Sequence, residues 1–265
     1  APRVLATTTP RPVPLVRRLV GQGGGVRVTG GRTADNAAHL AQGFVAAMQD
    51  NYGGTRLGRQ ELDGELIDEV AGALWSRDLI ERCRVAHVPG GDKDGALLGR
   101  VVVAVDPPAS AGGDACGIVV VGLGSDGRAY VIADASVGGL SPEGWARAVA
   151  GAALAYGADK VVAEANNGGA MVESVLRAAE TALPVKLVHA SRGKVARAEP
   201  VAALYEAGRV AHRGAFPDLE DQMCGLVAGG DYVGPGRSPD RADALVWALT
   251  ELMLGRRGAA RLRWL

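Results

Sequence analysis

The chain has 265 residues and a formal net charge of zero, because 29 lysines and arginines balance 29 aspartates and glutamates. This length suits one large domain or two ordinary ones. A composition of 48% hydrophobic and 22% charged residues excludes a disordered chain and a coiled coil. The neutral total excludes a uniformly basic surface for nucleic acid, although it leaves room for local basic clusters.

The first 88 residues predict a series of short elements. Residues 4–6 and 26–28 have the apolar pattern of short strands, and a helix is expected at 15–20 after closely spaced prolines. Thr33 is the expected cap of a helix from 34 to 50. Residues 56–65 predict a charged turn region, and two further helical segments are expected at 66–74 and 79–82. The polar, glycine-rich segment 89–95 then predicts a linker or an exposed loop.

The pattern changes after this segment. Residues 101–105 read Val-Val-Val-Ala-Val, which is typical of a strand buried on both faces. Residues 117–122 and 129–134 predict two more strands, separated by a tight Gly-Ser-Asp-Gly turn at 124–127. Three strands with short connections predict an antiparallel meander.

Helices and strands alternate in the rest of the chain. Ser141 as cap and Pro142 at the first helical position predict a helix that ends near residue 156. Strands at 161–163 and 185–188 alternate with helices at 171–179, 199–206 and 219–227. Ser238 and Pro239 are expected to open a last helix that runs to about 254. A meander followed by this alternation predicts an α/β protein with an RNase H-like mixed sheet, antiparallel and then parallel, flanked by helices.

Acidic residues stand where several of these elements begin or end. Asp106 ends the first buried strand, Glu164 ends the strand at 161–163, and Asp240 and Asp243 share one face of the last helix. A strand-end carboxylate packs poorly, but it directs a hard oxygen ligand into a crevice. Converging carboxylates without histidine or cysteine suit Mg²⁺ or Mn²⁺. Two such ions about 4 Å apart activate a water and stabilise the leaving oxygen of a phosphodiester. Any one of these acids alone is more often a turn or cap residue, and Asp114 is interpreted as a turn residue.

Three motifs together resemble the nuclease domain of the large terminase subunit, the DNA-packaging motor protein of tailed phages and gene transfer agents. They are VDPP at 105–108, AEANNGG at 163–169 and PDRADALVWAL at 239–249, and segments 189–200 and 208–212 are similar to it too. The resemblance spans about residues 98–255. It implies an RNase H-like endonuclease that cleaves concatemeric double-stranded DNA with divalent metal ions. By motif match, Asp106, Glu164 and Asp243 are the catalytic metal-binding acids, and Asp240 is a candidate fourth ligand.

The first part of the chain resembles the end of the ATPase domain that precedes the nuclease in this family. Residues 4–12 and 56–66 carry this resemblance. The phosphate-binding signature GxxxxGK[ST] is absent, since no Lys-Ser/Thr follows the glycines at 21–25. We therefore expect residues 1–88 to be a smaller α/β remnant of the ATPase domain with a linker, 98–255 to be the nuclease, and 256–265 to be a basic tail. ATP hydrolysis is not expected from this chain alone.

Local basic clusters predict contacts with DNA phosphates. Residues 186–213 hold six lysines and arginines against two glutamates. Among them, Arg192, Lys194 and Arg197 are predicted to neutralise phosphates without reading the base sequence. The resemblance implies double-stranded DNA, the portal protein, the small terminase subunit and other copies of the large subunit as partners.

The remaining features concern the cellular setting. Three widely spaced cysteines, Cys83, Cys116 and Cys224, predict buried free thiols in a reducing compartment. No apolar run approaches the roughly 18 residues that span a bilayer, and the chain shows no signal-peptide pattern. We therefore expect a protein of the bacterial cytoplasm, which is the host cytoplasm if a phage encodes it.

Two alternatives stay open. One is another RNase H-like nuclease, such as a junction resolvase or an RNA–DNA hybrid nuclease, which a panel of substrates would separate. The other is a non-catalytic module that docks on a packaging motor. The predicted group of carboxylates argues against the second alternative, because close like charges require a cation.

Overall fold

A computed structural model describes residues 4–10, 13–21, 25–41, 43–53, 55–67, 69–87, 98–108, 115–166, 169–179, 184–230 and 232–255. The predicted linker at 89–95, the basic tail at 256–265 and Asp114 lie outside these residues. The chain forms two compact units, Ala1–Ala71 and Gly72–Leu265. Within the described residues, no helix is both long and apolar enough to cross a bilayer.

The first unit consists of short helices. They are α1 (Pro14–Gly21), the 3-10 helix η1 (Thr33–His39), α2 (Phe44–Tyr52) and α3 (Arg56–Glu61). The strands predicted at 4–6 and 26–28 are wrong, because these residues are irregular and pair with no neighbouring strand that the structure describes. A single strand leaves its backbone hydrogen-bonding groups unpaired, so apolar alternation without a partner does not make one. The α/β character was predicted for residues 1–88, whose described part contains helices and one short strand at Arg84–Val85.

The helices of this unit also differ from the prediction in their boundaries. The helix expected from 34 to 50 is divided, because Gly43 adopts a left-handed φ of 82° between η1 and α2. Thr33 lies inside η1 and does not cap it. The predicted turn region contains α3, whose N-cap Thr55 accepts the Gly58 N–H at 2.9 Å. The described residues of 66–74 form no helix.

The second unit is built on a sheet that has seven strands among the described residues. These are β1 (Arg84–Val85), β2 (Leu98–Asp106), β3 (Gly117–Gly124), β4 (Ala129–Asp134), β5 (Lys160–Glu164), β6 (Val185–Val188) and β7 (Val210–Arg213). Their order is β1-β7-β4-β3-β2-β5-β6. The antiparallel pairing of β2, β3 and β4 confirms the predicted meander. The other neighbours pair in parallel, so the sheet is mixed, as predicted.

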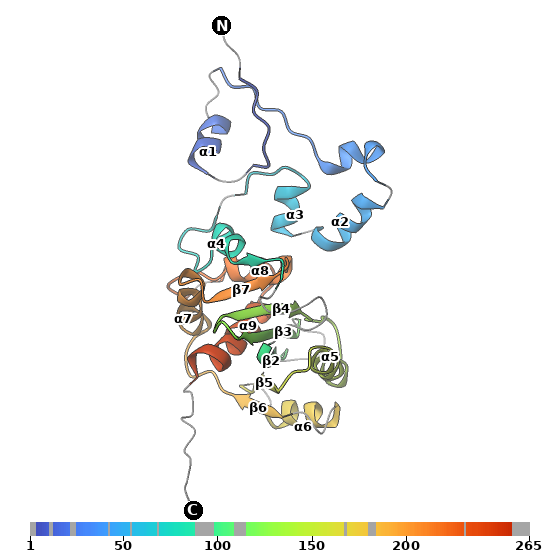
Figure 1. Ribbon diagram of the computed structural model, residues 1–265, viewed down its shortest axis with the longest axis vertical. Helices are drawn as coiled ribbons and strands as arrows, with labels where there is room; N and C mark the ends of the chain where they lie inside the picture. Colours follow the sequence, from blue (N-terminus) through green and yellow to red (C-terminus); the bar gives the residue numbers. More distant parts are fainter. Residues whose placement is uncertain are drawn as a thin grey trace, which may run out of the picture. The chain divides into compact units, whose positions relative to one another are not determined.

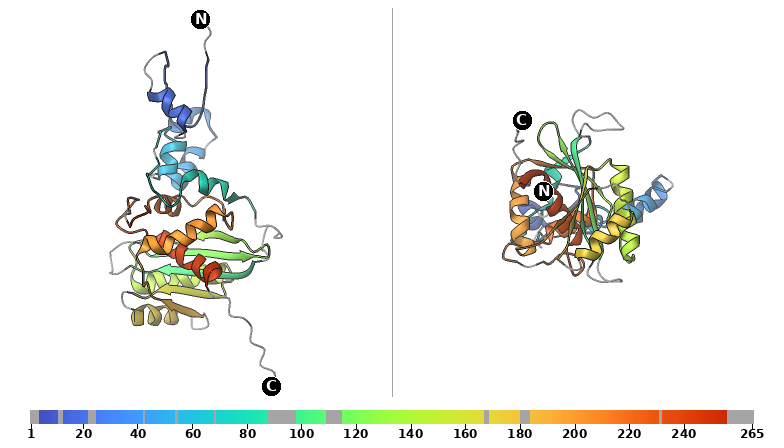
Figure 2. Two further views of the ribbon diagram at one scale, coloured as in Figure 1. Left: turned by 90° about the vertical axis from the view of Figure 1, so that its left-hand side faces the viewer. Right: turned by 90° about the horizontal axis from the view of Figure 1, so that it is seen from below.

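Helices cover both faces of this sheet (Figures 1 and 2). One face carries α5 (Pro142–Ala155) and α6 (Gly169–Ala179), and the other carries α4 (Arg77–Arg82), α7 (Lys194–Glu206), α8 (Pro217–Cys224) and α9 (Asp240–Leu249). A short π-helix, η2 (Thr250–Leu254), continues α9. Side chains of β2 alternate between the faces: Val102 packs with α7 to α9, and Val103 packs with α5 and α6. The valine-rich run is therefore buried on both faces, as predicted.

The segment before β2 belongs to the second unit. β1 pairs in parallel with β7, with Arg84 opposite His212. Trp75 and Ile80 are buried in the same core cluster as Tyr205 of α7. The structure therefore divides the chain after Ala71, whereas the sequence predicts the end of the first domain at residue 88. The three cysteines are buried and free, which confirms the part of the prediction that concerns burial and pairing.

Candidate metal centre

Asp106 and Glu164 come together because β2 and β5 are parallel neighbours. Val105 of β2 pairs with Ala163 of β5, so the acids that directly follow stand next to each other at the carboxyl ends of the two strands. Each carboxylate side chain is 13% exposed, which leaves it accessible from one side. The strand ends thus present two acids at one edge of the sheet, as the sequence predicted.

Asp240 and Asp243 reach the same edge through a close approach of α9 to β3. Gly117 is the first residue of β3 and pairs with Asp106. A Cβ atom at Gly117 would lie 2.0 Å from the carbonyl oxygen of Asp240, so only glycine accommodates the helix here. The two aspartates of this helix are buried, with Asp243 only 1% exposed.

The crowding of these carboxylates shifts their pKa values. Burial raises the pKa of Asp106 well above its usual range, and the neighbouring Asp243, Glu164 and Asp240 raise it further against the effect of Lys194. Burial also raises the pKa of Asp243, although Lys194 and Arg197 oppose the shift. The ionised forms are therefore costly here, and a bound cation would stabilise them.

Two basic residues of α7 lie among the acids. The Lys194 ammonium contacts the Asp243 carboxylate and lies 3.8 Å from Asp106 Oδ2. The Arg197 guanidinium lies 3.1 Å from Asp243 Oδ1 and 3.5 Å from Glu164 Oε2. Together, the four carboxylates and these two cations have a formal total charge of −2.

Trp247 completes the surroundings of Glu164. Its indole Nε1–H donates a hydrogen bond to Glu164 Oε2 at 2.6 Å. The Arg197 guanidinium lies over the same indole ring, 4.7 Å from the ring centroid, which is a cation–π geometry. Glu164 is therefore held by two neighbours that would fix its orientation.

In the part of the chain that the structure describes, no three His, Cys, Asp or Glu side chains are arranged closely enough to hold a metal as they stand. Lys194 and Arg197 each contact two of the carboxylates. The donor set nevertheless fits a hard divalent cation, because all donors are carboxylate oxygens.

The structure separates the three residues predicted to contact DNA. Arg197 faces the acids with only 9% of its side chain exposed, and Lys194 contacts them while remaining 41% exposed. Arg192 is exposed in the loop between β6 and α7. Of the three, Arg192 occupies the position best suited to a phosphate, and Arg197 the position least suited to one.

Sequence reasoning missed how α9 begins. Ser238 was expected to cap this helix, and that expectation is wrong: α9 begins at Asp240, and Ser238 Oγ instead accepts a hydrogen bond from Lys194 at 2.7 Å. The missing acceptor comes from α8, where Gln222 Oε1 accepts the N–H groups of Arg241 at 2.8 Å and Ala242 at 3.3 Å. A partner 19 residues away leaves no local pattern in the sequence.

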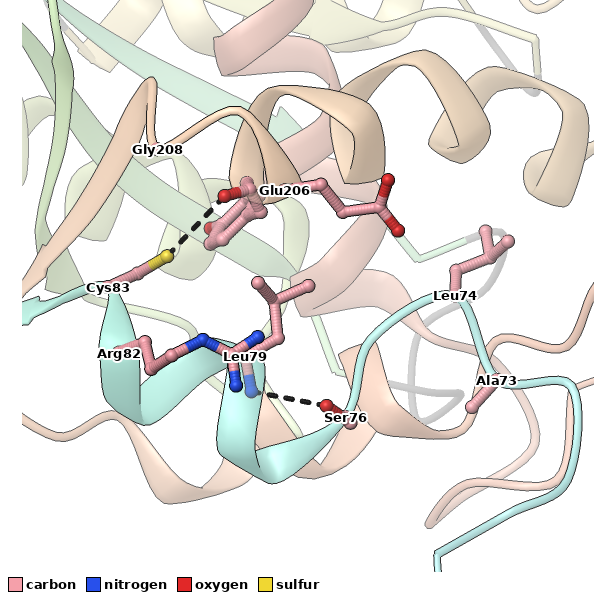
Figure 3. Close-up of a pocket in the computed structure, with 9 residues that line it drawn as sticks. Ala73, Leu74, Ser76, Leu79, Arg82, Cys83, Glu206 and Gly208 are labelled. Carbon is pink, nitrogen blue, oxygen red and sulfur yellow. Dashed lines mark hydrogen bonds between the residues drawn. The ribbon is translucent and has the colours of Figure 1, made fainter.

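A cavity of about 400 Å³ lies elsewhere in this unit, between α4 and the end of α7 (Figure 3). The residues that line it are Ala73, Leu74, Ser76, Leu79, Arg82, Cys83, Tyr205, Glu206 and Gly208. The Cys83 thiol donates a hydrogen bond to the carbonyl oxygen of Tyr205 at 3.7 Å. None of the four clustered carboxylates lines this cavity, so it is not part of the candidate metal centre.

One family model matches this chain. The family model described as "Terminase RNaseH-like domain" matches residues 103–252. Among solved structures, the large terminase nuclease of thermophilic phage G20c with bound magnesium is 16% identical over 69% of this chain and 98% of that chain, with a TM-score of 0.49. The nuclease domain of the large terminase subunit gp2 of bacterial virus Sf6 is 17% identical over 67% of this chain and 98% of that one, with a TM-score of 0.49.

A longer protein also matches. The HK97 bacteriophage large terminase is 14% identical over 80% of this chain, with a TM-score of 0.46. This chain covers 51% of that structure. A search of curated proteins found no match.

Proposed function

This chain belongs to the Terminase RNaseH-like domain family, and we propose that it is the nuclease part of a terminase large subunit. In this role it is a divalent-metal-dependent endonuclease that cleaves concatemeric double-stranded DNA during genome packaging. The observation that carries the proposal is the gathering of Asp106, Glu164, Asp240 and Asp243 at one edge of the sheet, where burial and mutual repulsion raise the pKa of Asp106.

The residues that would hold the metal are Asp106, Glu164 and Asp243, with Asp240 as a fourth ligand. The chemistry supplied by bound Mg²⁺ or Mn²⁺, as one ion or two, is activation of a water and stabilisation of the oxygen that leaves a phosphodiester. The chain's own residues prepare the site. Lys194 holds the carboxylates of Asp106 and Asp243 close to each other by contacting both.

The basic residues near the site would bring the DNA backbone to it. Arg192 is exposed in the loop that leads into α7, and Lys194 follows at the start of that helix. An exposed guanidinium neutralises a phosphate without reading the bases. In the complete motor, the proposed partners are the portal protein, the small terminase subunit and other copies of the large subunit.

The proposal is tested by cleavage of supercoiled plasmid in Mn²⁺ or Mg²⁺. Wild-type protein should nick and linearise the plasmid, and Asp106→Asn should not, although the variant should melt at the same temperature or higher because one repelling charge is removed. The matched control is Asp126→Asn, which changes an acid in the hairpin between β3 and β4 that hydrogen-bonds Tyr130. Cutting by Asp106→Asn at the wild-type rate would refute the assignment.

A substrate panel separates the alternatives. Duplex DNA, a four-way junction and an RNA–DNA hybrid are offered at equal concentration with saturating Mn²⁺. Preference for the junction or the hybrid would identify the protein as another RNase H-like nuclease rather than a packaging nuclease. If metal addition changed neither DNA cleavage nor thermal stability, a non-catalytic docking module would be the better description.

A further inference from the structure

The first turn of α9 carries two of the four clustered acids but has no cap from its own segment. The first N–H groups of any helix lack partners within that helix. Pro239 occupies the N-cap position and makes no side-chain cap hydrogen bond. The hydroxyl oxygen of the preceding Ser238 accepts a hydrogen bond from Lys194. The sequence immediately before α9 therefore does not fix where Asp240 and Asp243 stand.

Gln222 of α8 supplies this missing acceptor. Its Oε1 accepts hydrogen bonds from the backbone N–H groups of Arg241 and Ala242, the two residues between the acids. Gln222 is only 9% exposed, so water competes little for these hydrogen bonds. A neutral amide also adds no further negative charge beside the carboxylates, whereas an acidic cap would.

The helix that carries Gln222 is itself rigidly anchored. The Glu220 carboxylate is fully buried and accepts hydrogen bonds from Arg84 at 3.0 and 3.1 Å and from Arg77 at 3.2 Å. His212 Nδ1 lies 3.2 Å from Glu220 Oε1. Moving α8 would break buried ion pairs, which is strongly destabilising. Gln222 therefore projects from an element that resists displacement.

A side chain of the first turn adds a second restraint. Arg241 lies between the two acids in sequence, and its guanidinium donates to Asp134 at the end of β4 at 2.7 Å. The same guanidinium lies 3.3 Å from Asp218 of α8. The first turn of α9 is thus held from β4 and α8, in addition to its contact with Gly117 of β3.

We propose that Gln222 is a positioning residue for the metal centre: it fixes the first turn of α9 from α8 and so places Asp240 and Asp243 opposite Asp106. This inference rests on the proposed metal-dependent nuclease function. Residues that orient metal ligands from outside the ligand set typically change affinity or activity by about 10-fold to 100-fold when they are replaced.

The test is Gln222→Met, which keeps the length of the side chain and removes the acceptor. Its dissociation constant for Mn²⁺, measured by titration calorimetry well below the melting temperature, should rise by about tenfold or more. The turnover number for plasmid cleavage should fall by a similar factor, with an unchanged KM for DNA. Gln222→Glu retains the acceptor oxygen and should recover at least half of the lost Mn²⁺ affinity on a logarithmic scale.

A matched control separates positioning from general instability. Val149→Ala removes buried methyl groups from α5 on the opposite face of the sheet and should leave the Mn²⁺ affinity unchanged. The inference is overturned if Gln222→Met binds Mn²⁺ as tightly as wild type, if Val149→Ala loses as much affinity, or if Gln222→Glu recovers none.

A measurement on wild-type protein covers the case in which Gln222→Met does not fold. The amide hydrogens of Arg241 and Ala242 should exchange at least about tenfold more slowly than free amides, as hydrogen-bonded groups do. Exchange at the rate of free amides would overturn the inference. A failure of this inference can be distinguished from a failure of the proposed function. If the proposed function is wrong, wild-type protein neither binds Mn²⁺ nor cuts DNA.

Discussion

Replacing Gly117 by alanine should disassemble the metal centre while leaving most of the sheet intact. The added Cβ would lie 2.0 Å from the Asp240 oxygen and 2.4 Å from the carbonyl carbon, and both atoms are backbone. Ordinary contacts begin at 3.4 Å, so the first turn of α9 must retreat by about 1.4 Å, the difference between 3.4 and 2.0 Å. A misplacement of about 1 Å costs about 100-fold in rate, and overpacking costs about 1–3 kcal/mol of stability.

The assay is Mn²⁺-dependent plasmid cleavage, with Mn²⁺ affinity and thermal melting measured on the same samples. We expect at least about a 100-fold loss of cleavage in a protein that still melts cooperatively. Gly99→Ala is the control, because Gly99 also lies in a strand of this sheet and its added Cβ would meet only Leu123 O, at 3.8 Å. If Gly117→Ala cleaved DNA and bound Mn²⁺ like wild type, the packing account of the site would be wrong.

Three further predictions follow from the charges. Arg197→Met removes one of the two cations that contact the buried Asp243 carboxylate. The free energy of unfolding of the metal-free protein, measured by calorimetry, should fall by about 3 kcal/mol and should partly recover in saturating Mn²⁺. An unchanged free energy of unfolding would contradict this. Arg192→Ala should weaken the binding of duplex DNA equally for all base sequences. In fluorescence anisotropy, the magnitude of the slope of log affinity against log salt concentration should fall by about 1. An unaltered slope would exclude a phosphate contact of Arg192. Burial opposes ionisation of Glu220, but hydrogen bonds from His212 and Arg84 lower its pKa to about 2. Because the folded pKa lies below the unfolded value of about 4.3, this carboxylate stabilises the fold at neutral pH, and up to about 3 kcal/mol is lost as the pH falls from about 5 to below 2. The free energy of unfolding of Glu220→Gln, measured with urea, should fall less steeply than that of wild type as the pH is lowered. The same pH dependence in both proteins would argue against the effect.

The candidate site was largely predictable because its signals are local. A carboxylate directly after an apolar run, as at Asp106 and Glu164, is visible in the sequence, and the parallel pairing of the two strands brings those ends together. The cap at Ser141 was predictable for the same reason: its side chain accepts the N–H of Gly144, three residues further on.

Other features had no local signal. β1 and β7 contain two and four residues, too few to show a period, and they are strands only because they pair with each other and with β4. The two strands predicted in the first unit failed for the converse reason, since their apolar residues find no partner strand within the described chain.

The sequence by itself determined the three-stranded meander, the valine-rich strands at the centre of the sheet and the acids at their ends, because these depend on side-chain period and on residues next to each other. Only the tertiary structure decided what surrounds those acids. Lys194 and Arg197, which the sequence suggested for DNA, contact the carboxylates, and Gln222 caps a helix that begins 18 positions later at Asp240. These contacts join side chains that are distant in sequence, and their partners are chosen by the packing of α7, α8 and α9 on one face of the sheet. The zero net charge of the chain therefore hides a cluster of opposed charges that only folding brings together.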